Sequence, residues 1–327
     1  MSARIQVEDL RISYGSGDGS ICAVDGVSLA LAAGQSLGIV GESGSGKTTV
    51  GMAIGKLLAP SARFDGGDIF VEGQSVLRSD SAQLRTLRRD KLGFVFQNPM
   101  TALDPTMRVG RQAGLLIGEK HDSDAVHQLL QRARLDNPKQ VATKFPHELS
   151  GGMAQRVVIA LAIAREPSVV IADEPTASLD ASIKGAILEL LMALGGDMGA
   201  SLIIMSHDLR SVARRCDRIA VMYGGRIVEQ GASGDVFERP CHPYTQALIH
   251  AQAGNEKPGE RLHTIPGLPP LLRHSAGSCA FAPRCPYAQD VCRTVRPLEV
   301  QLRDRRVACH FATEQGLKPA LMPSEAA

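Results

Sequence analysis

The stretch SLGIVGESGSGKTTVGMAIGKLL, residues 36–58, decides the fold of this chain. Its residues 37–40 form a short apolar run, which predicts a buried strand. A glycine-rich turn follows, and we expect a helix from about Lys47. The turn at residues 41–48 fits the pattern G-x-x-x-x-G-K-[ST] at every fixed position. This order of strand, turn and helix predicts a phosphate-binding loop in an α/β fold.

The chemistry of this loop, hereafter the P-loop, is that of an anion site. Glycine permits backbone angles that aim successive N–H groups at one anion, and the positive end of the helix dipole adds attraction. We expect Lys47 to reach the β- and γ-phosphates of a nucleotide and Thr48 to bind Mg²⁺. Kinases, GTPases and motor ATPases all carry such a loop, so further motifs must decide the function.

Composition sets the broad class of protein. The 327 residues are 44% hydrophobic, enough for a sizeable core in about two domains of ~150 residues each. The 36 basic and 34 acidic residues nearly balance, which gives no reason to expect a nucleic-acid partner. The N-terminus lacks the apolar core of a signal peptide, and no apolar run approaches the ~20 residues of a membrane span. We therefore expect a cytosolic chain with reduced thiols, in which clustered cysteines suggest metal before disulfides.

A second strand carries paired acids. In SVVIADEPTASLD, residues 168–180, an apolar run at 169–172 predicts a buried parallel strand. Asp173 and Glu174 follow at its C-terminal end, where ligands bind in open α/β sheets. We expect Asp173 to hold Mg²⁺. Glu174 is expected to point the opposite way along the strand and to polarise a water.

A second glycine motif stands upstream of those acids. Ser150, Gly151 and Gly152 precede a helical run with apolar residues at 157, 158, 161 and 164. A serine hydroxyl and glycine amides at a helix start make another anion site. One nucleotide does not need both loops from the same chain.

The stretch LSGGMAQR, residues 149–156, resembles the signature motif of ATP-binding-cassette (ABC) ATPases. The full ordered set of that family's motifs is present once. It comprises Tyr14, the P-loop, Gln97 in FQNP, residues 149–152, Asp173 and Glu174, Asp180 in SLD, and His207 in IIMSHD. The resemblance covers about residues 4–250. It implies a cassette at residues 1–232, with a RecA-like core, an antiparallel β subdomain and a helical subdomain at about 98–156.

The resemblance also implies roles for single residues. ATP's triphosphate would be wrapped by Gly41, Glu42, Ser43, Gly44, Ser45, Gly46, Lys47, Thr48 and Thr49. Tyr14 would stack on adenine, and Mg²⁺ would be held through Thr48, Gln97 and Asp173. Glu174 would act as general base or orient the attacking water. His207 would contact the γ-phosphate, and Gln97 would sense Mg²⁺, the water and a membrane partner.

The remaining motifs would act on a second subunit. Ser150, Gly151 and Gly152 would bind the γ-phosphate of ATP held by the opposite cassette, and Asp180 would act across the same interface. Two cassettes joined head to tail would bury two ATP molecules, which accounts for the second anion loop.

Three further stretches narrow the resemblance. NPMTALDP at 98–105, HPYTQALI at 242–249 and IPGLPPLL at 265–272 are similar to the ATPase subunits of peptide, opine and nickel permeases. The implied partners are two integral membrane permease subunits, an extracytoplasmic solute-binding protein and a second ABC ATPase, either a relative or another copy. The implied place is the cytoplasmic face of the cell (inner) membrane. Contact with the permeases is expected at four residues of the first stretch: Pro99, Met100, Leu103 and Pro105. Packing within the loop is the alternative role for these residues. Di- or oligopeptide is the solute implied; nickel, opine and other small solutes stay open.

Four of the seven cysteines lie in the last 49 residues of the chain, within the expected C-terminal extension at 233–327: Cys279, Cys285, Cys292 and Cys309. Four thiolates suit either Zn²⁺ or a 4Fe–4S cluster, and their spacing lacks the C-x2-C pairs of common zinc sites. The family resemblance implies the iron–sulfur cluster, with a structural role. His242 and His310 are possible substitute ligands, and four buried thiols without metal are the other alternative.

Two other functions compete with an import ATPase. Soluble ABC proteins that work on DNA or ribosomes usually carry two cassettes or long coiled-coil insertions, and the sequence has neither. A regulatory metal-binding module would use ATP only as a switch. Glu174 and His207 argue against that, because both serve hydrolysis in the family.

Overall fold

The computed structural model describes residues 3–15, 19–118, 123–252, 264–270, 277–314 and 316–317. The chain divides into two compact units, and we describe each by itself. Unit 1 comprises Met1–Arg4, Leu31–Ser36 and Arg78–Met205, and unit 2 comprises Ile5–Ala30, Leu37–Leu77 and Ser206–Ala327. None of the helices in the described ranges is both long and apolar enough to cross a membrane.

Unit 1 is built on three parallel strands. They are β6 (Leu92–Val95), β7 (Val169–Asp173) and β8 (Ser201–Ser206), with β7 in the middle. Every residue of β7 and β8 is buried, as their continuous apolar runs predict. Two helices pack on β6: α2 (Ser81–Asp90) and α7 (Gly151–Ile163). The strand expected at 169–172 is confirmed.

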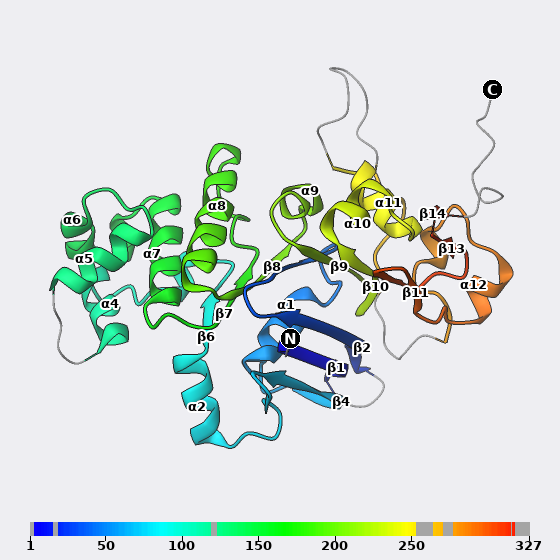
Figure 1. The fold of residues 1–327 in the computed structure, drawn as a ribbon, viewed down its shortest axis with the longest axis horizontal. Coiled ribbons are helices and arrows are strands. Elements are labelled where there is room, and N and C mark those ends of the chain that lie inside the picture. The colour runs from blue at the N-terminus through cyan, green and yellow to red at the C-terminus, as the bar shows by residue number, and fades with distance from the viewer. Residues whose placement is uncertain are drawn as a thin grey trace. The chain divides into compact units, whose positions relative to one another are not determined.

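The other helices of unit 1 lie mostly between Gln97 and Ser150. They are α3 (Pro99–Ala102), α4 (Val109–Ile117), α5 (Ser123–Arg132), α6 (Pro138–Thr143) and a short 3-10 helix, η2 (Pro146–Glu148). Figure 1 shows α4 to α7 gathered into one bundle, and α4 and α5 both pack against α7. The predicted helical character of this segment is confirmed, while the subdomain boundaries remain a prediction. The long helix α8 (Ala181–Met198) also contacts α7.

Unit 2 contains the P-loop. An antiparallel sheet has the strand order β2-β1-β4-β5, made of β1 (Ala3–Tyr14), β2 (Ile21–Ala32), β4 (Ala62–Val71) and β5 (Gln74–Ser75). Strand β3 (Ser36–Val40) pairs in parallel with β9 (Arg218–Tyr223), and β9 pairs with β10 (Arg226–Ala232). Helix α1 (Lys47–Ile54) follows the P-loop. The expected strand at 37–40 and the helix start at Lys47 are confirmed.

The C-terminal part of the chain continues unit 2. Strand β12 (Arg305–Val307) pairs with β10 and with β11 (Val300–Leu302), so it extends the same run of strands. Unit 2 also contains α9 (Leu209–Ala213), α10 (Ser233–Glu238), α11 (Pro243–His250), the 3-10 helix η3 (Ala282–Arg284), α12 (Asp290–Thr294), β13 (Ala312–Thr313) and β14 (Gly316–Leu317). The described residues beyond 232 thus belong to the unit that holds the P-loop. A separate domain at 233–327 remains a prediction.

Candidate functional site

The P-loop curls around its own lysine. Lys47 Nζ donates to the carbonyl oxygens of Gly41 at 2.8 Å and Glu42 at 3.0 Å. The side chain is only 6% exposed, so its ammonium lies inside the concavity of the loop. Gly46 is the N-cap of α1 and has φ of 102°, which leaves the first amides of the helix facing the loop. The arrangement suits a bound phosphate group.

Two glycines of the loop are required by space as well as by backbone angle. A Cβ on Gly41 would lie 2.2 Å from the carbonyl oxygen of Met222, and one on Gly46 would lie 2.5 Å from that of Ala23. Real Cβ atoms do not approach backbone so closely. The loop therefore lies directly on the backbone of β2 and β9, which fixes its shape.

We predict that Gly46→Ala destabilises the chain more than Gly44→Ala. Gly44 also has a positive φ, 79°, but a Cβ there meets nothing within 4 Å. Left-handed strain alone should cost Gly44→Ala about 1–2 kcal/mol. Gly46→Ala adds the clash with Ala23 and should cost about 1–3 kcal/mol more. Chemical unfolding of both variants checks this, and equal losses would contradict the close packing described here.

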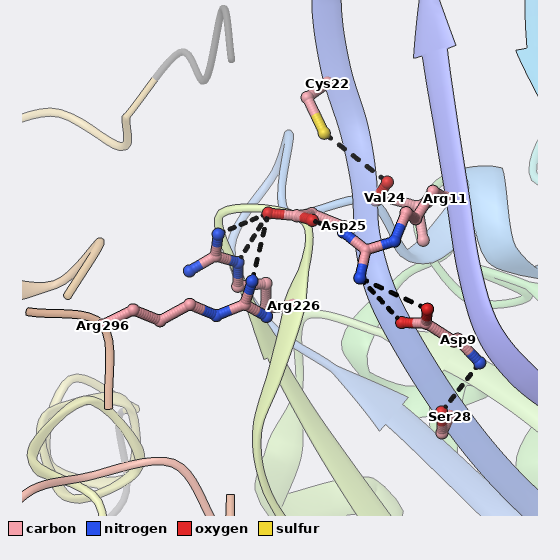
Figure 2. Close-up of polar contacts among 8 residues, drawn as sticks. All are labelled: Asp9, Arg11, Cys22, Val24, Asp25, Ser28, Arg226 and Arg296. Atoms are coloured by element: carbon pink, nitrogen blue, oxygen red, sulfur yellow. Dashed lines mark hydrogen bonds and ion pairs between the residues drawn. The ribbon is translucent and has the colours of Figure 1, made fainter. Parts of the chain in front are cut away.

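Three arginines surround the buried carboxylate of Asp25, which lies close to the P-loop in unit 2 (Figure 2). Asp25 is 1% exposed, and its carboxylate accepts from Arg11 Nη1 at 2.9 Å and Arg226 Nε at 2.9 Å. Arg296 Nη1 lies 3.9 Å from the same carboxylate. Backbone hydrogen bonds link Asp25 to the P-loop: Asp25 N donates to Gly225 O, and Gly225 N donates to Ser45 O. No motif in the sequence predicted this cluster.

In unit 1, the paired acids and the predicted glutamine lie on one edge of the parallel strands. Val95 of β6 is in register with Ala172 of β7, and Gln97 and Glu174 each lie two residues beyond that pair. Asp173 closes β7 and is 4% exposed. Carboxylate and amide oxygens are ligands that Mg²⁺ accepts. The carboxyl edge of β6 and β7 therefore carries groups that Mg²⁺ accepts, and the magnesium site itself remains a prediction.

Glu174 departs from the expected strand geometry. Strand β7 ends at Asp173, and Glu174 has φ of 45°, in the left-handed region. Its N–H donates to Met205 O at 2.9 Å, and Ala177 N closes a turn onto Glu174 O. Its direction is thus set by a strained turn and not by the alternation of a strand. Strain of this kind is concentrated at functional sites, where the surrounding structure holds it.

The second glycine motif forms the start of α7. Ser150 is the N-cap, and its Oγ accepts from Met153 N at 3.3 Å. Ser150 and Gly151 are exposed. Neither Gly151 nor Gly152 has a positive φ, and a Cβ on each would meet only ordinary contacts, at 3.7 Å and 3.5 Å. Nothing within the described chain requires glycine at these two positions.

The remaining predicted residues lie at element ends. Tyr14 is the last residue of β1 and is half-buried in unit 2. His207 follows β8 directly, is exposed, and its carbonyl accepts from Gln252 Nε2 at 3.1 Å. Asp180 is the N-cap of α8 in unit 1. The P-loop, Tyr14 and His207 thus fall in unit 2, whereas Gln97, Asp173, Glu174, Asp180 and the second glycine motif fall in unit 1.

The four C-terminal cysteines gather around one small cavity. Cys279, Cys285, Cys292 and Cys309 all line it, and none forms a disulfide within the described residues. Burial, helped by the neighbouring thiols, raises the pKa of Cys285 to about 12 and that of Cys309 to about 11. The cavity holds about 20 Å³, the space of about one water.

These thiols do not form a ready metal site. Within the described ranges, no group of three or more His, Cys, Asp or Glu side chains is arranged to hold a metal ion. His242 and His310 line the same cavity, but His242 Nδ1 accepts from Tyr244 N at 3.0 Å and His310 Nε2 lies 3.0 Å from Val295 O. The four thiols therefore have the donor chemistry of a metal site, but the described side chains are not arranged to hold a metal ion.

Comparisons with known proteins agree with this geometry. The family profile "ABC transporter" matches residues 24–177, and the profile "Oligopeptide/dipeptide transporter, C-terminal region" matches residues 228–292. Solved structures share the fold of the cassette. A dimeric ATP-binding cassette, MJ0796, bound to ADP and Pi is 28% identical with a TM-score of 0.63, over 70% of this chain and 98% of that one. The protein cbiO1 from Clostridium perfringens, part of the complex cbiONQ, is 29% identical with the same TM-score, over 73% and 92%.

Curated relatives extend the similarity to nearly the whole chain. The oligopeptide transport ATP-binding protein OppD of Salmonella typhimurium is 39% identical over 319 residues, 95% of this chain and 94% of OppD. The dipeptide transport ATP-binding protein DppD of Haemophilus influenzae is 39% identical over 321 residues, 96% and 97% of the two chains. This chain has the ABC ATPase fold and belongs to the family of ATP-binding proteins of oligopeptide and dipeptide ABC transporters.

Proposed function

We propose that this chain binds and hydrolyses ATP to drive peptide import through a membrane ABC transporter. The observation that carries the proposal is the pairing of β6 with β7, because Gln97, Asp173 and Glu174 stand at the carboxyl ends of these neighbouring strands. The names of OppD and DppD support peptide as the solute. Nickel, opine or another small solute is the alternative for the same role.

The ATP would be held by the P-loop. The amides of residues 41–49 and the ammonium of Lys47 would surround the β- and γ-phosphates, and Tyr14 would stack on the adenine. Mg²⁺ would be held through Thr48, Gln97 and Asp173 and would supply charge neutralisation on the phosphates. The buried position of Asp173 and the inward position of Lys47 support these roles.

Hydrolysis requires little covalent chemistry from the protein. Glu174 would orient or deprotonate the attacking water, and His207 would contact the γ-phosphate. Positioning and charge neutralisation then carry the transfer of the phosphoryl group to water. The turn at Glu174, tied to Met205 O, supports the role of Glu174 because it fixes the backbone that carries the carboxylate.

A second cassette would complete each site. Ser150, Gly151 and Gly152 would contact the γ-phosphate of the ATP in the opposite subunit, and Asp180 would act across that interface. The exposure of Ser150, Gly151 and Asp180, and the absence of any contact in the described chain that requires glycine at 151 and 152, support an external ligand. Either a related ATPase or a second copy of this chain fits. The dimeric form of the cassette MJ0796 supports the pairing.

We predict that Gly151→Ala separates stability from turnover. The added methyl group meets only Leu179 at an ordinary distance, so the unfolding transition should stay within about 0.5 kcal/mol of the wild type. ATP binding by the isolated chain should be unchanged, while ATPase activity of the assembled transporter should fall about tenfold or more, because the methyl group occupies the approach to the partner's phosphate. Phosphate release and equilibrium nucleotide binding measure the two effects.

The matched control is Gly196→Ala in α8. A Cβ there also meets nothing that must move, yet the position lies outside the motif. ATP binding and ATPase activity of this control should both match those of the wild type. Full turnover by Gly151→Ala would refute the proposed role of the second glycine motif.

The partners would be two permease subunits and an extracytoplasmic solute-binding protein, with this chain at the cytoplasmic face of the membrane. The exposure of Met100 and Pro105, in the segment after Gln97, supports permease contact there. Met100 is 42% exposed on the short helix α3, whose N-cap Asn98 accepts from Met100 N. Pro99 and Leu103, in contrast, are buried, so they would hold the segment in place and not touch the permease.

We also propose that the four cysteines bind a metal group, with a 4Fe–4S cluster as the first candidate and Zn²⁺ as the alternative. The gathering of four thiols without disulfides around one cavity supports this. Metal binding would require the thiols to lose their protons, so binding should release protons and weaken at low pH. The group would stabilise the C-terminal part and take no part in hydrolysis.

Metal analysis tests this proposal. Protein purified without oxygen should contain about four iron and four sulfide per chain, or about one zinc in the alternative. Cys285→Ser should lose the metal and unfold at a lower temperature. Cys22→Ser, which changes a thiol outside the cavity, should keep both. A wild-type chain that is folded, stable and free of metal would contradict both candidates.

A further inference from the structure

One residue of the P-loop is held by the C-terminal part of the chain. Arg284 Nη1 donates to Glu42 Oε2 at 2.6 Å, and Nη2 donates to Glu42 Oε1 at 3.0 Å. The side chain of Arg284 is 4% exposed and that of Glu42 is 25% exposed. A bidentate pair with this little water around it is among the strong charge-assisted contacts in proteins. The hydrogen bond to Glu42 also raises the pKa of Arg284 above its ordinary value, so its charge is permanent.

The backbone of Glu42 is fixed from the same side. Glu42 N donates to the hydroxyl oxygen of Tyr244 at 2.8 Å. Tyr244 is fully buried, with its ring 4.5 Å from that of Tyr223 and 5.4 Å from that of Phe281. Both the amide and the carboxylate of one P-loop residue are therefore positioned by residues that lie far along the chain.

Arg284 is itself held rigidly. Its Nε donates to Pro266 O at 2.7 Å, Nη2 also donates to Ile265 O, and Nη1 also donates to the hydroxyl of Tyr223. With the two contacts to Glu42, all five guanidinium donors have acceptors. The stretches that contain Tyr244, Ile265 and Arg284 thus meet at one point of the P-loop.

The charge of Glu42 makes this arrangement consequential. Its carboxylate belongs to the loop that would surround a triphosphate, and its own carbonyl oxygen accepts from Lys47 Nζ. An unpaired carboxylate in that loop would repel the phosphates and attract the ammonium of Lys47 away from them. A paired carboxylate has neither effect.

We propose that Arg284 is a positioning residue for ATP: it neutralises Glu42 and fixes the P-loop, so that full nucleotide affinity depends on the folded C-terminal part. This inference rests on the proposed ATP-binding role of the P-loop. It assigns to the segment next to Cys285 a task in the nucleotide site, beyond its own stability. Loss of structure there would weaken ATP binding even with every P-loop residue intact.

A double-mutant cycle in the full-length chain tests the proposal. Arg284→Met should weaken ATP binding about 10- to 100-fold, because it leaves the Glu42 carboxylate uncompensated. Glu42→Gln should bind ATP at least as tightly as the wild type. The double variant, Glu42→Gln with Arg284→Met, should recover most of the affinity that Arg284→Met lost. The readouts are the dissociation constant for a fluorescent ATP analogue and KM, while kcat should change little.

Two further variants guard the interpretation. Arg303→Gln breaks the exposed pair with Glu314 in the same C-terminal part and should bind ATP normally. Arg284→Lys keeps the charge without the fork and should bind with intermediate affinity. If Arg284→Met does not fold, Arg284→Lys takes its place in the test.

Three outcomes would overturn the proposal. A double variant as weak as Arg284→Met would mean that Arg284 acts only through the fold. Weak binding by Glu42→Gln alone would mean that the carboxylate itself is needed. Unchanged binding by Arg284→Met would mean that the pair does not matter to the nucleotide. If the wild type binds no ATP, the proposed function fails instead, which distinguishes the two failures.

Discussion

Glu174→Gln is expected to lower ATP turnover by about 10²- to 10⁴-fold while ATP binding is retained. Loss of a positioned proton acceptor has this typical effect. Glutamine has nearly the same size, and the turn at residue 174 is held by its backbone N–H to Met205 O, which the substitution keeps. Binding and turnover should therefore separate. Phosphate release under saturating ATP and equilibrium nucleotide binding measure the two quantities.

Glu166→Gln is a closely matched control. Glu166 is another glutamate of unit 1 with a positive φ, 49°, and its carboxylate pairs with Arg132 in an exposed contact at 3.0 Å. An exposed pair of this kind contributes little to stability. The control should hydrolyse ATP like the wild type. If Glu174→Gln hydrolysed ATP faster than about a tenth of the wild-type rate, Glu174 could not have its proposed role.

Lys47→Met is expected to abolish useful ATP binding, with affinity about 10²-fold lower or worse. The ammonium is held inside the loop by Gly41 O and Glu42 O, where it would meet the phosphates. Each hydrogen bond to a charged group contributes about 1.5–3 kcal/mol, and methionine provides none. The stem length is preserved, so the packing of the buried side chain should suffer little. Titration calorimetry with ATP and Mg²⁺ measures the loss.

Lys56→Met is the control for removing a lysine near the same helix. Lys56 lies just beyond α1, and its Nζ donates to Leu77 O at 3.0 Å. The control should bind ATP normally. Equal affinities for Lys47→Met and the wild type would exclude the P-loop as the phosphate site. The contrast with Glu174→Gln, which should keep binding, separates the binding step from the chemical step.

Local patterns in the sequence were sufficient for the P-loop. A short apolar run predicts β3, and the glycines with Lys47 predict the turn and the start of α1, because these preferences act between neighbours in the chain. The same holds for β7 and for the N-cap at Ser150. Features of this kind depend on a few adjacent residues, so one stretch of sequence contains the whole signal.

Contacts between distant segments were not predictable in that way. Glu42 and Arg284 are 242 positions apart, and neither stands in a pattern that names the other. The enclosure of Asp25 by Arg11, Arg226 and Arg296 has the same character (Figure 2). Tertiary packing creates these pairs, and a single sequence offers only the residue types.

Two details of the candidate site also depended on the structure. Glu174 lies just beyond the end of β7 in left-handed backbone, so the alternation rule for strands does not give the direction of its side chain. The open surroundings of Gly151 and Gly152 are a property of the folded surface. The sequence shows only that these residues are small. The structure adds that no neighbour in the described chain requires them to be small.

The most direct test of the central claim is peptide uptake by the complete transporter. The chain would be assembled with its permease subunits in vesicles, with ATP and Mg²⁺ on the side of this subunit and labelled peptide with the solute-binding protein on the other. We predict that peptide accumulates with the wild-type chain and with Glu166→Gln, and that accumulation and phosphate release stop together with Glu174→Gln. Accumulation that continues with Glu174→Gln, or that proceeds without ATP, would contradict the account.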